Sequence, residues 1–88
     1  GVGGSTANAL ATVLAELAGS HQVIAITHLA QVAVLADAHY TVTKTAGDTP
    51  ETILTPVKGD ERVAEVARLL SGTATETSLA HARELLRQ

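Results

Sequence analysis

The chain has 88 residues, 45% hydrophobic and 17% charged, with no Cys, Met, Trp or Phe, which allows one small domain at most and excludes a multidomain enzyme. Its net charge of −3, with 6 Lys and Arg scattered from Lys44 to Arg87, excludes a basic nucleic-acid stripe and a polybasic membrane patch. Without Cys there are no disulfides or thiolate zinc sites, and no apolar run approaches the ~18 residues that span a bilayer, so a cytoplasmic setting is expected.

The composition also indicates part of a larger protein. Tyr40 is the single aromatic residue, which leaves a core of Ala, Val and Leu, whereas a free-standing domain of this size usually needs larger anchors. The chain begins at Gly1 without an initiator Met. Both features favour a fragment, that is, a single partial domain over residues 1–88.

The first half of the chain predicts a helix, a strand and a second helix. Apolar residues at helical spacing follow Ser5, the expected N-cap, and Gly19 is the expected stop. Residues 22–27 form a β-branched run without polar alternation, typical of a strand covered on both faces in a parallel sheet. Residues 29–36 return to helical spacing.

The middle of the chain predicts a β-hairpin over residues 39–57. Residues 39–45 alternate as a half-exposed strand does, and His39 is assigned to its exposed side. Turn-forming residues follow at 46–50, and a second β-prone run leads to Pro56, which is expected at the edge or end of its strand.

Two terminal helices are predicted over residues 60–87. Asp60 is the expected cap of the first helix, and capping-box spacing from Thr73 to Glu76 predicts the start of the second. The charged residues of the first helix are interpreted as a solvated face with weak pairs at helical spacing: Glu61, Arg62, Glu65 and Arg68. The expected fold class is therefore α/β, in the order α-β-α-β-β-α-α.

The most informative position is Thr27-His28, where the predicted strand ends and a helix begins. Ligands of α/β sheets bind beyond the carboxyl ends of strands, where helix N-termini offer free N–H groups. An imidazole there can donate to a phosphate oxygen or orient a water; alternatively, His28 only caps the helix. His21, His39 and His81 are interpreted as surface residues, and the histidine spacings match no zinc pattern, so no metal site is expected.

The segment Gly1-Val2-Gly3-Gly4 precedes the first helix and could present backbone N–H groups to an anion. No Lys follows it and no strand precedes it, so the phosphate-loop pattern is not met. The glycine-rich opening is therefore weak support for a nucleotide site by itself.

Several segments together resemble the end of an ABC-type ATPase head of the SMC-like class. They are the glycine-rich opening, the stretch 23–33 around Thr27-His28-Leu29-Ala30-Gln31, and residues 36–39. Residues 59–72 and 80–86 resemble the C-terminal segment of such a head in the RecN family of bacterial DNA repair proteins. The resemblance covers nearly the whole chain; Ala30 departs from it, because the family commonly has Pro there.

The resemblance implies a role for each matched residue. Residues 1–4 would be the tail of the D-loop, which in this family crosses the dimer interface beside the nucleotide. His28, in an H-loop over residues 27–31, would be the catalytic switch histidine that contacts the γ-phosphate of ATP and positions the attacking water. Gln31 would support the loop, or would lie plainly on the helix surface. The residues implied to be cofactor-binding are Gly1, Gly3, Gly4, Thr27 and Gln31.

The resemblance also implies what lies outside these 88 residues. The Walker A loop, the Q-loop, the signature motif and the Walker B pair would precede the chain, so ATP and Mg²⁺ would be cofactors of the full-length parent. No cofactor and no ATP turnover are expected for the segment alone. The implied partners are the remainder of its own ATPase head, a second head in a homodimer, and DNA through the parent protein, in a nucleoid-associated setting without membrane contact.

The leading interpretation is thus a fragment of a RecN-like ATPase that acts in recombinational repair of DNA double-strand breaks. One alternative is a non-catalytic interaction module, in which the hairpin and the terminal helices dock a partner. Another is a head fragment of a different SMC-like or ABC protein. In isolation, the strand at 23–27 would lack its sheet neighbours, and the segment is expected to dimerise or aggregate.

Overall fold

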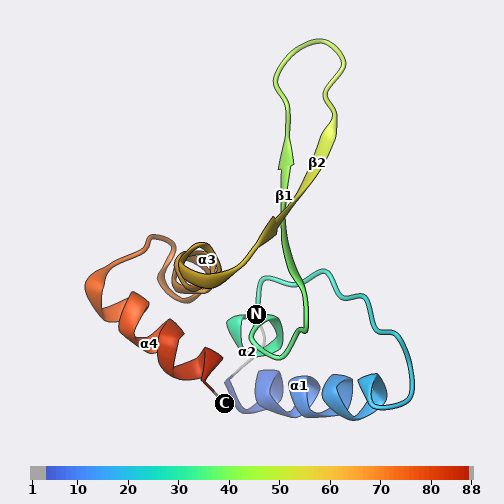
Figure 1. Cartoon of the computed structure of the whole chain (residues 1–88), viewed down its shortest axis with the longest axis vertical. Coiled ribbons are helices and arrows are strands. Elements are labelled where there is room, and N and C mark those ends of the chain that lie inside the picture. The colour runs from blue at the N-terminus through green and yellow to red at the C-terminus, as the bar shows by residue number, and fades with distance from the viewer. Residues whose placement is uncertain (1–3, 88) are drawn as a thin grey trace.

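The computed structural model describes residues 4–87, which form four helices and one hairpin (Figure 1). In chain order these are α1 (Gly4–Ala18), α2 (Ala30–Ala33), β1 (His39–Lys44), β2 (Thr52–Val57), α3 (Gly59–Ser71) and α4 (Glu76–Leu86). The hairpin projects away from the helices as a long ribbon (Figure 1). No helix within the described range has the length and apolar character needed to cross a membrane.

The helix predicted from the apolar spacing is present as α1, but only a narrow strip of its apolar residues is buried. Ala7 and Ala11, one turn apart, are 1% and 4% exposed, whereas the larger Leu10 and Leu17 remain largely in solvent. Ser5 is not the N-cap, because α1 already includes Gly4 and Ser5 lies in its first turn. A broad apolar flank of α1 is therefore uncovered.

The strand predicted at residues 22–27 is wrong for this structure. The segment forms neither helix nor strand, and Ile24 and Ile26 are 85% and 98% exposed. A strand needs a neighbour to pair its N–H and C=O groups, and the only sheet within residues 4–87 is the hairpin itself. The class remains α/β, but the observed order is α-α-β-β-α-α.

The predicted hairpin is confirmed as an antiparallel pair of β1 and β2. At its tip, the Thr45 N–H donates to the Glu51 carbonyl at 2.9 Å, and the Glu51 N–H donates to the Thr45 hydroxyl at 2.8 Å. Pro56 lies opposite Tyr40, one residue before β2 ends. Since β2 has a single neighbour, Pro56 occupies an edge strand, as expected.

The sides of β1 are the reverse of the assignment made from its alternation. His39 and Thr41 are half-buried, whereas Tyr40 and Val42 are 55% and 58% exposed. Cross-strand partners share a face, and the partner of His39 is the buried Val57, at the base of the hairpin next to α3. Contact with α3 therefore decides which side is covered, and alternation alone could not indicate it.

The main core lies where α2, α3 and α4 meet. Its fully enclosed residues are Ala30, Val66, Ala67 and Ala82, with exposed fractions between 0% and 3%. Partly buried aliphatic residues surround it: Val34, Val63, Leu69, Leu70, Leu79 and Leu86. Residues at helical spacing on α3 and α4 thus form the core side of these helices.

The ends of the terminal helices differ from the predicted caps. Lys58 holds the N-cap position of α3 without a side-chain cap, and Asp60 lies in the first turn, where its charge favours the helix dipole. The capping box of α4 joins Thr75 to Ser78: the Ser78 N–H donates to the Thr75 hydroxyl at 3.1 Å, and the Thr75 N–H donates to the Ser78 hydroxyl at 2.8 Å. Ser78 replaces the expected Glu76 because it is the residue three positions after the true N-cap.

The exposed segment at 22–27 generates a prediction about the isolated chain. Unpaired extended backbone with exposed Ile side chains is a template for intermolecular pairing. Sedimentation velocity over a concentration series should therefore show concentration-dependent self-association, which Ile26→Lys should reduce. Val13→Lys, the same change at a half-exposed position of α1, is the control. A monodisperse monomer at every concentration would contradict the prediction.

Candidate functional site

The predicted H-loop is a tight turn that leads into α2. The Thr27 hydroxyl accepts a hydrogen bond of 2.9 Å from the Leu29 N–H, a local bond that turns the extended segment toward the helix. Leu29 then takes the N-cap position with extended dihedral angles, without a side-chain cap. His28 lies between these residues with its side chain exposed. Thr27 therefore shapes the loop, and His28 is free to face a ligand.

Three of the residues selected from the sequence come together around one shallow hollow. Gly4 lines it from the start of α1, and His28 and Gln31 line it from the loop and α2. Leu69 and Leu70 of α3 also line this space of about 310 Å³. Residues 24 to 27 positions apart in the sequence thus share one site, with an imidazole, an amide and a helix start exposed to it.

The other selected residues lie elsewhere or outside the described range. Gly1 and Gly3 precede residue 4, where the description begins. Thr27 is half-buried and does not line the hollow; its hydroxyl serves the turn. Gln31 is half-buried at the hollow, which is consistent with support of the loop as well as with a place on the helix surface.

The helix that follows His28, α2, packs against α3. Ala30, the first residue of α2, packs against Val66 and Ala67, which are both 0% exposed. At the other end of α2, Arg62 donates hydrogen bonds to the carbonyls of Ala33 and Ala36 at 3.2 and 2.8 Å. The interpretation of Arg62 as a solvated residue is therefore wrong, because its partners lie 26 and 29 positions away and no local spacing could indicate them.

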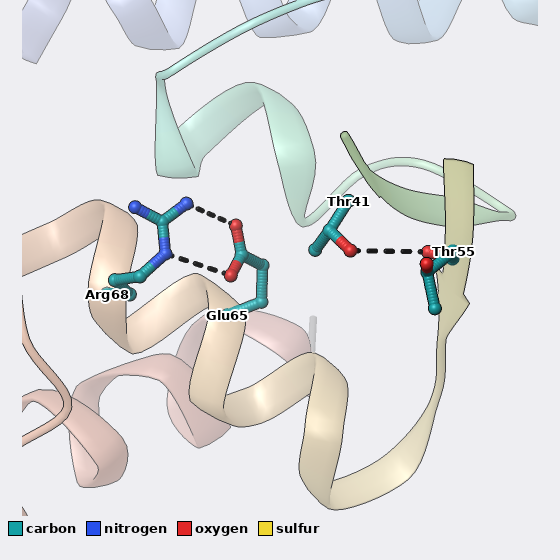
Figure 2. A network of polar contacts seen from close by, with 4 residues as sticks. All are labelled: Thr41, Thr55, Glu65 and Arg68. Carbon is teal, nitrogen blue, oxygen red and sulfur yellow. Dashed lines mark hydrogen bonds and ion pairs between the residues drawn. The ribbon is translucent and has the colours of Figure 1, made fainter. Parts of the chain in front are cut away.

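The ion pair predicted at helical spacing on α3 is present, but the Glu65 side chain is only 17% exposed and is not fully solvated. Arg68 forms a bidentate ion pair with Glu65, with 3.0 Å between the Arg68 Nε and a Glu65 oxygen (Figure 2). The Arg68 hydrogen bond holds the pKa of Glu65 below its ordinary value, against the opposing effect of burial. Figure 2 also shows Thr41 donating to the Thr55 carbonyl across the hairpin, at 3.5 Å.

His39 lies beside this charged face and is not a plain surface residue. Burial lowers its pKa from the ordinary 6.5, the positive charge of Arg62 lowers it further, and Glu65 opposes the shift. Its Nδ1 is buried without a hydrogen-bond partner among residues 4–87. A neutral imidazole at the base of the hairpin is therefore favoured in the folded chain.

Within the described range, no three His, Asp or Glu side chains gather closely enough to hold a metal ion. The hollow beside His28 offers one imidazole, one amide and backbone groups. These groups can contact phosphate oxygens or a water at one edge of a nucleotide. They do not include the carboxylate and hydroxyl ligands that Mg²⁺ prefers.

Comparison with known proteins decides the relationship of the chain. No family model matches it. It is 52% identical to the DNA repair protein RecN of Treponema pallidum over 99% of its own length, and 48% identical to that of Deinococcus radiodurans over 98%. The RecN protein of Bacillus subtilis is 39% identical over 100% of the chain. The chain is homologous to a segment of bacterial RecN.

The chain spans only a small part of these relatives. It covers 16% of the Treponema pallidum protein and 15% of the Deinococcus radiodurans protein. The homology confirms the resemblance to a segment of RecN. Because the matched regions cover 98% or more of the chain, they span the loop around His28 and the terminal helices.

The environment of His39 generates a prediction about pH. Because its pKa is lower in the folded chain than the ordinary 6.5, the unfolded chain binds more protons once the pH falls toward and below that value. The free energy of unfolding should therefore decrease as the pH falls from about 7 to about 5, and His39→Gln should flatten this dependence. Denaturant titrations at each pH measure it.

His81→Gln changes an exposed histidine on α4 and is the matched control for that series. Glu65 changes the free energy of unfolding only at lower pH. Because the pKa of Glu65 is lowered from 4.5 in the folded chain, its stabilising contribution is lost as the pH falls below 4.5. An unchanged pH dependence in His39→Gln would contradict the assignment of a neutral, partly desolvated His39.

Proposed function

We propose that the chain is the C-terminal part of an ABC-type ATPase head in a RecN-like protein that acts in recombinational repair of DNA double-strand breaks. The single observation that carries the proposal is the meeting of Gly4, His28 and Gln31 at one hollow, in a chain homologous to RecN along its full length. The homology favours RecN over a head of another SMC-like or ABC protein.

In this proposal, His28 is the switch histidine. Its exposed ring, directly before α2, donates a hydrogen bond to a γ-phosphate oxygen or accepts one from the attacking water. Gln31 restricts the loop from within α2, and Gly4 belongs to a D-loop tail that reaches the same hollow. Positioning of this kind is most of what a protein contributes to phosphoryl transfer.

The chain's own residues complete an edge of the nucleotide site and do not form the whole of it. ATP bound with Mg²⁺ supplies the phosphoanhydride that is cleaved and the charge neutralisation of its phosphates. The lining of the hollow contains no Lys to hold the phosphates and no carboxylate for Mg²⁺. These 88 residues are therefore proposed to be inactive alone and active within a full-length parent.

The proposed partners follow from the uncovered surfaces. Residues 22–27 are proposed to become a strand of the parallel sheet in the remainder of the same head, because their β-branched side chains and free backbone groups fit such a place. A second head would face the D-loop tail in a homodimer. DNA would be bound by the parent, in the bacterial cytoplasm at the nucleoid, since this segment carries a net charge of −3.

A second candidate function rests on the exposed face of the hairpin. Tyr40, Val42 and Leu54 are 55%, 58% and 63% exposed on the same side of the ribbon, where Val42 and Leu54 are cross-strand partners. An apolar face of this kind is typical of a docking surface. If His28 has no catalytic role, a non-catalytic interaction module becomes the better explanation of the chain.

The test of the proposed function is ATP turnover of the full-length parent with His28→Ala. Loss of a group that acts on the transition state should lower kcat about ten-fold or more while nucleotide binding persists. His21→Ala, an exposed histidine at the end of the α1 turn, is the matched control and should retain the parental kcat. A parental kcat in His28→Ala, with binding intact, would contradict the role of His28.

A further inference from the structure

The helix that carries the H-loop is too short to be stable by itself. α2 has four residues, a single turn, and isolated helices of this length do not form in water. Its first residue, Ala30, is held by the core of α3 and α4. At its C-terminal end, the Ala33 carbonyl accepts a backbone hydrogen bond from the Ala36 N–H at 3.2 Å. A carbonyl oxygen has two lone pairs, so the Ala33 and Ala36 carbonyls can each accept from donors elsewhere in the chain.

Arg62 supplies those donors. One terminal guanidinium nitrogen donates to the carbonyls of Ala33 at 3.2 Å and Ala36 at 2.8 Å. A cation at this place also complements the negative end of the helix dipole. The Nε of Arg62 is buried, without a hydrogen-bond partner among the described residues, and the side chain as a whole is half-buried.

These contacts fix α2 to α3 at both ends, by Ala30 at one and by Arg62 at the other. His28 lies two residues before α2, and the hollow that it lines is also lined by Leu69 and Leu70 of the same α3. Any rotation of α2 against α3 would therefore move His28 relative to the wall of its site.

We propose that Arg62 is a positioning residue of the H-loop, which sets the place of His28 by holding the C-terminal end of α2 against α3. The inference rests on the proposed function, because it assigns Arg62 a role in ATP turnover through His28. It predicts that loss of Arg62 lowers kcat without weakening ATP binding, since misplacement of a catalytic group by about 1 Å can cost on the order of 100-fold in rate.

The experiment is steady-state and single-turnover ATP hydrolysis by the full-length parent with Arg62→Ala and Arg62→Lys. Arg62→Ala should lower kcat about ten-fold with KM for ATP within about two-fold. Arg62→Lys keeps the charge but replaces the planar guanidinium by a compact ammonium on a different stem, so it should recover part of kcat. Arg68→Ala, an exposed cation of the same helix whose partner is Glu65, is the matched control.

A double-mutant cycle with His28→Ala separates positioning from general loss of stability. If Arg62 acts through His28, Arg62→Ala should lower single-turnover rates little further in the His28→Ala background. An equal fall in both backgrounds would overturn the inference. If Arg62→Ala does not fold, the same double-mutant cycle is carried out with Arg62→Lys. A parental kcat in Arg62→Lys would then overturn the inference.

The two proposals fail in distinguishable ways. A parental kcat in His28→Ala would overturn the proposed function and the inference together. A lowered kcat in His28→Ala, with parental values in both Arg62 variants, would overturn only the role of Arg62.

Discussion

The structure depends on the contact of Ala30 with Val66, Ala67 and Ala82, where three helices meet through very small side chains. Only a core of this kind lets the single turn of α2 sit directly on α3 and α4, because a larger residue at Ala30 would need space that the core does not have. His28 lies two residues before Ala30 along the chain. The packing of the core and the placement of His28 are thus consequences of one contact.

Because the core side chains are small, much of the apolar surface of the chain remains uncovered. A core of three alanines and one valine buries little apolar area, and Ile24, Ile26 and Leu54 remain more than half exposed. Isolated domains of this size have a thin margin of stability. Uncovered apolar surface on the strand-like segment, the hairpin and α1 agrees with a segment that spans 16% of a RecN protein, and it supports the proposal that the rest of an ATPase head covers these faces.

The sequence predicted those elements whose signals are local. Helical spacing in α1, α3 and α4, and turn residues between β1 and β2, are readable because helices and tight hairpins are specified by neighbours in the chain. Residues 22–27 could not be predicted in the same way: their β-branched composition is correct for a strand, but a strand also needs a partner, and none is described. The covered side of β1 and the role of Arg62 likewise depend on contacts between distant elements.

For the candidate site, the end of a β-branched run indicated His28 as a position of interest, and the resemblance to ATPase heads added Gly4 and Gln31. The structure brings these three residues to one hollow. Arg62 was missed because its partners are the backbone carbonyls of Ala33 and Ala36. Every residue type has such a carbonyl, so the sequence does not indicate which ones accept a hydrogen bond.

The most direct test of the central claim is complementation between this chain and the part of the full-length parent that precedes Gly1, each produced separately. The account predicts that neither turns over ATP alone, that the mixture does, and that a His28→Ala chain joins the complex without restoring turnover. Full turnover by the preceding part alone, or a complex whose turnover does not depend on His28, would contradict it.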